Sequence, residues 1–485
     1  MNDTLGNTMK MNKLFLAMSI ISASAVMTGC GSDSESADPV PRQGEGLSFV
    51  TCNEETKSCT LEGTMDKSYT LDADYEYRLS GLLQVGKGNL ELDDTAAVTA
   101  VKAAGVTLTI EPGVSVKANS DGVLLVTRGS KLMAEGTATN PITFSSKQDA
   151  DFEGEGEWGG VVIQGLAPQY GAGNTGICGT TVCNVAGEGG DFIGNYGGLD
   201  KADNSGILKY VRIAEAGKVA GPNNEINGLT LQGVGHGTTI EYIQVHGNQD
   251  DGIEWFGGTV NVKYAVLTNN DDDDLDFDEG YQGNIQHVLI RKHPTKESAS
   301  GSNDPRGIEA NSSDTDYVPD TKAVLANITV YGGMVSNWNG TDHTGKQPGM
   351  RLRGSVTVNI YNTVVANFAD ECVRVDYSNH DDIDTTPKEP SIVNLTNVMA
   401  SDCNNTFDHE TPDTNVALVE EVASFDTAWA LTNTAATLDA VPTITALDNG
   451  SNFTFDQTDY IGAVKPGTAE ANTWYAGWII EGSLD

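Results

Sequence analysis

Two consecutive stretches of the chain repeat one pattern, IEYIQVHGNQDDGIEWFGGT at residues 240–259 and VKYAVLTNNDDDDLDFDEGYQG at residues 262–283. Each copy has a β-rich run, a corner of Asn and Asp residues, a second alternating run and a Gly-containing exit. Ile253 of the first copy corresponds to Leu275 of the second, 22 positions later (275 − 253). A repeat of this length buries its apolar face only against its neighbours, so the pattern predicts a solenoid.

The second run of the repeat recurs along the chain as GIEWF (252–256), DLDFD (274–278), GIEAN (307–311), GMRLR (349–353) and CVRVD (372–376). Alternation along a strand predicts that Ile253, Leu275 and their equivalents face inward. The intervening residues then form two outward columns. The first column is Glu254, Asp276, Glu309, Arg351 and Arg374, and the second is Phe256, Asp278, Asn311, Arg353 and Asp376.

Upstream phrases carry a family resemblance. IEPGV (110–114), the RG, KL, AEGTA and NPITF elements of 128–144, and EWGGVVIQG (157–165) resemble the repeats of exported bacterial β-helix lipoproteins. The resemblance implies an all-β fold, namely a right-handed, single-stranded parallel β-helix with caps at both ends. The closing segment (458–482) is similar to that of the same family.

The predicted organisation follows from these patterns and from shifts in composition. We expect a lipoprotein signal peptide (1–29), a flexible tether (30–50), an N-terminal cap (51–100), a parallel β-helix (101–412) and a C-terminal cap (413–485). A Gly/Asn-rich insertion near 169–206 interrupts the coils. Within the C-terminal cap, the apolar spacing of 415–433 indicates a helix.

The N-terminus has the features of an export signal. Lys10 and Lys13 precede a short apolar run, Leu14–Val26, which is too short to span a bilayer as a helix. The following residues up to Cys30 resemble the bacterial lipobox. The resemblance implies that Cys30 carries lipid and anchors the protein in the outer membrane, on its periplasmic or its cell-surface side.

The remaining six cysteines fall into the pairs Cys52–Cys59, Cys178–Cys183 and Cys372–Cys403. In an exported chain this predicts up to three disulfides. Zinc is the alternative, but no pair has CxxC spacing with a companion His. The chain also carries 68 acidic and 28 basic residues, a net charge of −40. This charge repels phosphates, so we exclude nucleic acid as a partner.

The acidic corners suggest a cation site. Ca²⁺ prefers six to eight oxygen ligands from carboxylates and carbonyls. The candidate metal ligands are Asp250, Asp251, Asp272, Asp274, Asp276 and Asp278. The alternative is a solvated ladder of Asn and Asp turns, in which these side chains only satisfy corner backbone groups.

Two functions remain open from the sequence. The first is a non-enzymatic surface binding module for a glycan, an outer-membrane partner protein or a divalent cation. The second is a polysaccharide lyase, assisted by Ca²⁺, or a glycoside hydrolase working in an acidic/Arg groove. Its candidate catalytic residues are Arg351, Arg353, Arg374, Asp276, Asp278 and Glu309. Ion pairing along the column is the alternative role for these arginines.

Overall fold

The structure is a computed structural model that describes residues 43–148, 151–170, 182–220, 225–293, 305–313, 317–333, 348–376, 390–409 and 415–485. Residues 43–485 belong to one unit. The expected signal peptide and the lipidation site Cys30 lie outside the described residues. In the described part, no helix is both long enough and apolar enough to cross a membrane.

One face of the molecule consists of short strands that pair in parallel from coil to coil. They are β7 (Val123–Val126), β10 (Val161–Gln164), β14 (Leu229–Gln232), β16 (Ile253–Phe256), β18 (Leu275–Asp278), β20 (Ile308–Asn311), β22 (Met350–Arg353), β24 (Glu371–Val375) and β26 (Asn405–His409). We call this face the short-strand face.

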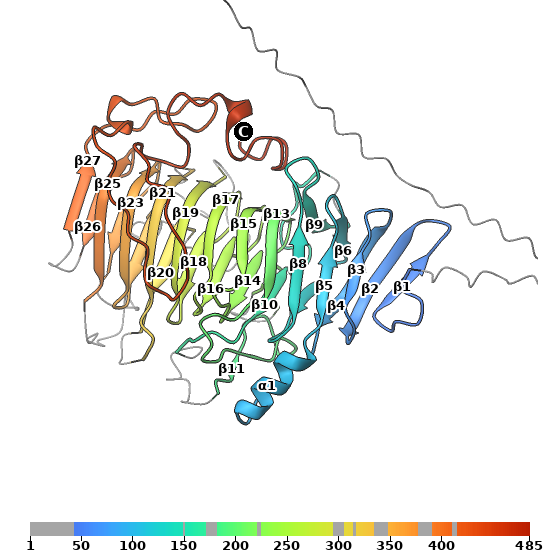
Figure 1. The fold of residues 1–485 in the computed structure, drawn as a ribbon. Helices are drawn as coiled ribbons and strands as arrows, with labels where there is room; N and C mark the ends of the chain where they lie inside the picture. The colour runs from blue at the N-terminus through green and yellow to red at the C-terminus, as the bar shows by residue number, and fades with distance from the viewer. Residues whose placement is uncertain are drawn as a thin grey trace, which may run out of the picture. The chain divides into compact units, whose positions relative to one another are not determined.

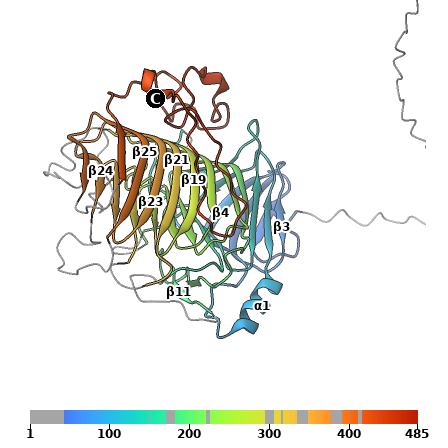
Figure 2. The ribbon, with the colours of Figure 1, turned by 60° about the vertical axis from the view of Figure 1, so that its left-hand side comes forward.

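Longer strands alternate with the short ones along the chain and pair in the same way. They are β13 (Gly206–Ala214), β15 (Thr239–His246), β17 (Asn261–Thr268), β19 (Gln282–Arg291), β21 (Lys322–Tyr331), β23 (Thr357–Ala366), β25 (Ile392–Ser401) and β27 (Asn415–Val419). Figures 1 and 2 show the strands lying side by side in one stack.

The long strands bend, so that each coil has three faces. The first half of β13 pairs with β8 (Lys131–Glu135), and its second half pairs with β9 (Ile142–Ser146). The residue at each bend has a positive φ, for example 50° at Tyr210 and 55° at Tyr242. A single residue in the left-handed region turns the chain at this point without ending the strand. The predicted right-handed parallel β-helix is confirmed.

The parallel pairing starts near the described N-terminus, within the range expected to cap the stack. The first elements are β1 (Val50–Asn53), β2 (Ser58–Met65), β3 (Tyr69–Leu71), β4 (Glu76–Val85), α1 (Thr95–Ala104), β5 (Thr107–Ile110) and β6 (Ser115–Ala118). β1 pairs with β2 antiparallel, and β2 pairs with β4 in parallel. The helix α1 begins after Asp94, whose side chain accepts a hydrogen bond from the Ala97 amide at 2.8 Å.

The core is the inside of the coils, where side chains from successive strands stack. Ile253, Leu275 and Ile308 are fully buried in it, as are Trp255 and Phe277. Complete burial of such a side chain contributes about 2 kcal/mol. Disulfides join Cys52 to Cys59 and Cys372 to Cys403. The predicted pairing of Cys178 falls partly outside the described residues, because Cys178 is among those not described.

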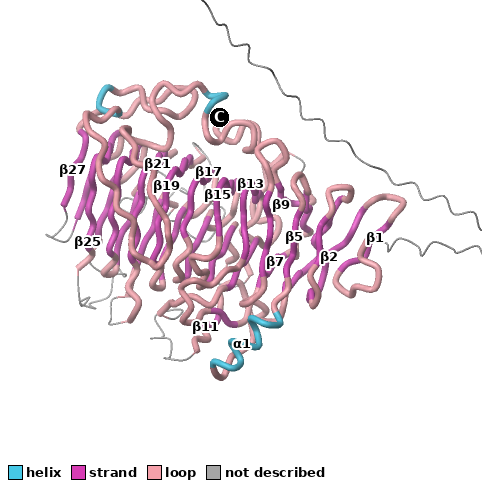
Figure 3. The backbone as a smooth tube through the Cα atoms, viewed as in Figure 1, coloured by secondary structure: helices cyan, strands magenta, loops and turns pink. Residues whose placement is uncertain are grey.

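The C-terminal segment differs from expectation. The helix predicted over 415–433 is wrong, because residues 415–419 form β27, whose side chains extend the stack. After β27 the chain runs back along the coils with only two short 3₁₀ turns, Thr434–Ala436 and Glu470–Asn472. Figure 3 shows most of this segment as loop on the side of the stack opposite α1 and β11 (Val185–Ala186), with one limb that runs down across the long strands. We call residues 420–485 the strap.

The strap is held on a column of stacked corner residues. Tyr210, Tyr242 and Tyr264 stack with ring centroids 4.5 Å apart, which matches the spacing between strands. Trp478 of the strap packs edge-on against Tyr210 and Tyr242, with ring centroids 5.8 and 6.2 Å apart. The side chain of Asp456 also bonds Lys263 of β17 and His287 of β19, and its backbone amide donates to Gln286, so the strap contacts several coils rather than one.

Candidate functional site: an outward carboxylate and arginine column

The predicted outward column is present on the short-strand face. The register places Glu254 beside Asp276, Asp276 beside Glu309, Glu309 beside Arg351, and Arg351 beside Arg374. Their neighbours along each strand point inward and are buried, as alternation requires. This arrangement follows from the repeat itself, since each coil supplies one residue to each position.

Carboxylates at the acidic end of the column lie close enough to share a cation. Three sets of side chains have potential ligand oxygens within 4.8 Å of one another. The sets are Asp250 with Asp251 and Asp272, Asp251 with Glu254 and Asp276, and Asp273 with Asp276 and Glu309. Four of the six predicted metal ligands therefore come together, and three further carboxylates join them.

The two other predicted ligands are placed differently. Asp274 is fully buried behind the column, where it accepts a hydrogen bond from Asn270 at 2.8 Å and pairs with Lys292 at 3.1 Å. Burial raises the pKa of Asp274 to about 6, although Lys292 opposes the shift. Asp278 faces outward two residues after Asp276 and belongs to none of the three sets. Burial and the neighbouring Glu279 and Asp276 raise its pKa.

The electrostatics of the acidic end favour a bound positive charge. Burial, and then repulsion by Glu309, raise the pKa of Asp276 to about 8, against the attraction of Arg353 and Arg306. Burial likewise raises the pKa values of Asp251 and Glu254. Among the described residues, Oδ1 of Asp276 and Oδ1 of Asp278 are buried atoms without a hydrogen-bond partner. An oxygen in this state is satisfied by a proton, by a bound water molecule or by a cation.

The arginines of the column are engaged in ion pairs. Nε of Arg351 and Nε of Arg374 each donate to Asp376, at 2.7 Å. Arg353 lies 2.9 Å from a carboxylate oxygen of Glu309. Arg351 is only 3 % exposed. Ion pairing, the alternative role considered from the sequence, is therefore what the structure shows for these guanidinium groups.

Two cations and one acid of this region were not singled out by the sequence analysis. Arg306 lies 3.0 Å from Glu309 and 3.2 Å from Asp273. Burial opposes ionisation of Glu309, but Arg306 and the two arginines of the next coil outweigh it and lower its pKa to about 2. Lys292 is the second cation. Glu188, from the insertion, lies close to Glu254, and burial raises its pKa to about 7. Of these three residues, only Arg306 had a signal in the sequence, because it lies three residues before Glu309.

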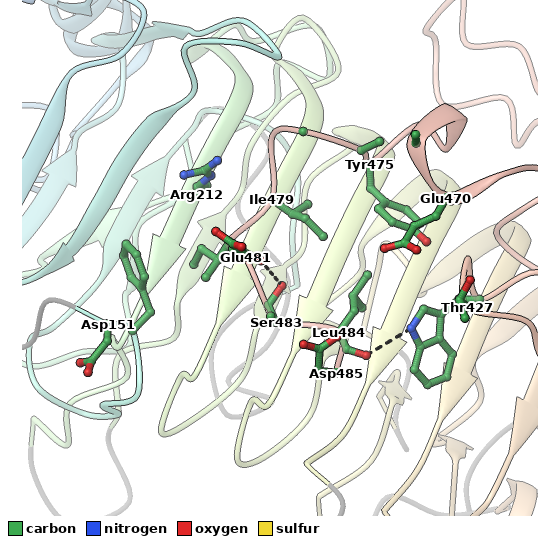
Figure 4. Close-up of a pocket in the computed structure, with 17 residues that line it drawn as sticks. Asp151, Arg212, Thr427, Glu470, Tyr475, Ile479, Glu481, Ser483, Leu484 and Asp485 are labelled. Carbon is green, nitrogen blue, oxygen red and sulfur yellow. Dashed lines mark hydrogen bonds between the residues drawn. The ribbon is translucent and has the colours of Figure 1, made fainter.

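A separate cavity of about 960 Å³ lies on the flank, between the strap and the loop that contains Asp151. Figure 4 shows Arg212 on one side of it and Tyr475, Ser483 and Leu484 of the strap on the other. Two of its polar side chains bind the protein itself: Arg212 donates to the carbonyl of Trp478, and Tyr475 donates to that of Ala428. None of the predicted site residues lines this cavity.

A comparison with protein families agrees with the architecture. A family model described as a pectate-lyase-like beta helix domain matches residues 63–479. A mutant of the periplasmic alginate epimerase AlgG is 11% identical, with coverage of 76% of this chain and 80% of that chain and a TM-score of 0.24. The A-module of the mannuronan C-5 epimerase AlgE4 of Azotobacter vinelandii is 12% identical, with coverage of 68% and 97% and a TM-score of 0.24. Neither structure is similar enough to bear on this chain's activity. No curated protein matches the chain.

Proposed function

The chain belongs to the family of pectate-lyase-like β-helix domains, and from this premise we propose that its outward carboxylates bind a divalent cation and, through it, an acidic glycan. The observation that carries the proposal is the buried, unpartnered Oδ1 of Asp276 among two sets of carboxylates within 4.8 Å. The donors are all oxygens, which is the chemistry that Ca²⁺ prefers. Ca²⁺ takes more ligands than one such set offers, so the carboxylate of a uronate can complete the shell.

Binding without turnover is the function that the geometry favours. A catalytic base has to reach the substrate proton and to accept it. Arg351 is buried and paired with Asp376, and Arg374 shares the same partner. Arg353 is paired with Glu309. Among the described residues of the column, the guanidinium groups therefore serve to hold carboxylates in place.

Catalysis is the second candidate, in the form of a Ca²⁺-assisted polysaccharide lyase or a glycoside hydrolase. The raised pKa of Asp276, about 8, favours it. A carboxyl group with this pKa is protonated at neutral pH when no cation is bound, and it can then act as a general acid. Arg353 and Arg374, whose side chains are each 21 % exposed, remain the candidates for a base.

A co-sedimentation experiment tests the binding function. In Ca²⁺, the full chain is mixed with insoluble calcium pectate gel or with a neutral polysaccharide gel. In chelator, the calcium pectate gel is replaced by a cation-free gel of the same uronate. We expect binding to the uronate gel in Ca²⁺ only. Binding that persists in chelator, or equal binding to the neutral gel, contradicts the proposal.

The same mixtures report on catalysis. Soluble polygalacturonate is incubated with the protein, and the absorbance of unsaturated products and the release of reducing ends are followed over time. The binding function predicts no increase above a blank. Turnover that is lost in Arg353→Ala but retained in Asp439→Ala, an exposed position on the strap, favours the enzyme instead.

We also propose that Cys30 carries the lipid anchor that the lipobox resemblance implies. Replacement of Cys30 by Ser removes the thiol that would be acylated. We expect the variant to leave the membrane fraction and to lose incorporation of a clickable palmitate analogue. Unchanged membrane association and unchanged labelling contradict the anchor.

A further inference from the structure

The core of the β-helix is exposed at the C-terminal end of the stack. Val416 of β27 is 37 % exposed, although its partner in the preceding coil, Leu395, faces the core and is 2 % exposed. Phe407 of β26 and Leu418 of β27 are likewise only partly buried against the core. Figure 1 shows these two strands as the last of the stack. We call β26 and β27 the terminal coil, and among the described residues no further layer covers its inward side chains.

The terminal coil also presents strand edges that can accept another strand. In the described part of the chain, β26 pairs only with β24, and β27 pairs only with β25. A second edge of each strand is therefore available for pairing. β27 contains no charged residue and no proline, which are the residues that ordinarily protect an edge. A disulfide between Cys372 of β24 and Cys403, two residues before β26, holds the terminal coil on the stack.

The strap covers the flank of the last coils rather than their end. It leaves β27 after Val419, and its residues Ala423 and Phe425 pack with Val364 of β23 and Met399 of β25. Val364 and Met399 pair with each other and alternate with inward residues of their strands, so both face outward. The contacts of the strap therefore lie beside the last long strands and leave the exposed core of the terminal coil as it is.

We propose that a second copy of this chain covers the open end, so that two molecules associate end to end through their terminal coils. A two-fold axis through the middle of β26 maps this strand onto itself in the reverse direction and exchanges the two halves of β27. Every strand of the terminal coil then meets an antiparallel partner. At the N-terminal end, β1 folds back on β2, and Phe49 and Leu61 are each 1 % exposed, so that end offers no open core for head-to-tail stacking.

Charge favours contact between two copies at this end. The net charge of −40 makes the molecules repel each other elsewhere. The strand residues of the terminal coil, five in β26 and five in β27, include a single acidic residue, Asp408, and no lysine or arginine. When Phe407 lies opposite its own counterpart, antiparallel pairing places Asp408 opposite the partner's Thr406. The two Asp408 carboxylates are then not directly opposed, so the pairing avoids the repulsion between like charges.

Sedimentation equilibrium of the full chain tests the association, in chelator so that cations do not bridge the molecules. We expect the natural protein to approach twice the mass of one chain as its concentration rises. Val416→Lys places a charge at the exposed core, and we expect this variant to stay at the mass of one chain. Val441→Lys, at a strap position 51 % exposed, is the matched control and keeps the dimer. A natural protein that stays at one chain mass, or a dimer that Val416→Lys leaves unchanged, overturns the proposal.

Cross-linking between thiols identifies the face that makes the contact. Asp408→Cys places a thiol at an exposed outward position of β26, and Val441→Cys places one on the strap. With a short bismaleimide, we expect covalent dimers above the background of the natural protein from Asp408→Cys only. Dimers from Val441→Cys alone, or from neither variant, overturn the proposal. If Val416→Lys fails to fold, as judged by circular dichroism, the comparison of the two cysteine variants still decides.

Discussion

Asp276 shows how the properties of one side chain depend on the coils before and after it. Glu254 and Glu309 are its neighbours in register, so the repeat alone places three carboxylates in a row. Unit charges at strand spacing repel by about 1 kcal/mol in water and by more where water is excluded. Arg306 and Arg353 relieve Glu309, whereas Asp276 keeps a pKa of about 8. Asp276 is therefore a position where a bound cation would relieve repulsion between neighbouring carboxylates.

Asp276→Asn is expected to abolish stabilisation by Ca²⁺. For the natural protein, a ligand that binds only the folded state raises its stability by about 3 kcal/mol at a hundredfold excess over Kd. The variant loses a ligand oxygen, and at neutral pH it replaces a carboxyl group that is protonated when no cation is bound, so we expect equal stability in chelator and no gain in Ca²⁺. Thermal melting in both buffers measures this. Asp439→Asn, at an exposed position, serves as the control, and a full Ca²⁺ shift in Asp276→Asn contradicts the assignment.

His246 gives a pH dependence that is separate from the carboxylates. The ring is 6 % exposed and bonds Thr268 at 2.7 Å, and burial lowers its pKa to about 4. Because the folded-state pKa of His246 is lowered, the stability that depends on its neutral form is fully present above the ordinary value of 6.5. This stability is lost as the pH falls through about 4. The shift in the pKa of His246 corresponds to about 3 kcal/mol of folding stability.

His246→Gln removes the titrating group and keeps a polar side chain. We expect denaturant unfolding of the natural protein to show a loss of stability between pH 6.5 and about 4 that is smaller in the variant. His293 lies close enough to His246 to oppose its protonation, so the variant His293→Gln is measured beside His246→Gln. An identical pH profile for natural protein and His246→Gln contradicts this assignment.

At the scale of elements, the sequence predicted what depends on local periodicity and missed what depends on distant contacts. Alternation with period two places Ile253 inward and Glu254 outward, and the register of the column follows. The stacked corner of Tyr210, Tyr242 and Tyr264 was not recognised, because a tyrosine within a β-rich run does not by itself indicate a bend. The contacts of Tyr210 and Tyr242 with Trp478 join residues more than two hundred positions apart.

The same limit explains the error at 415–433 and the incomplete site. Apolar residues such as Val416 and Leu418 fit helical spacing, yet β25 offers them a strand to pair with. Tertiary pairing of this kind overrides a local pattern. Arg306 and Glu188 reach the carboxylates from segments outside the repeat, so no column in the sequence contains them.

Trp478→Ala tests the strap as an element. The side chain is fully buried against Tyr210 and Tyr242, and truncation of such a residue costs about 3 to 5 kcal/mol. We expect earlier unfolding and faster hydrogen exchange in the strap, with the coil amides still protected. Val441→Ala, at a strap position 51 % exposed, is the control. Unchanged exchange throughout 420–485 contradicts a strap held at this contact.

At the scale of the whole molecule, the β-helix separates two tasks. The strap lies along the long strands, and the carboxylates lie on the short-strand face. A net charge of −40 repels an acidic glycan at long range. Binding of such a glycan therefore needs a cation that bridges the carboxylates of the protein and those of the glycan.

The most direct test is a calorimetric titration of an oligogalacturonate into the full chain, in Ca²⁺ and in chelator, for the natural protein and for Asp276→Asn. We expect heat of binding for the natural protein in Ca²⁺ and none in the other three cases. Binding of the natural protein in chelator, or binding by Asp276→Asn in Ca²⁺ with the affinity of the natural protein, would contradict it.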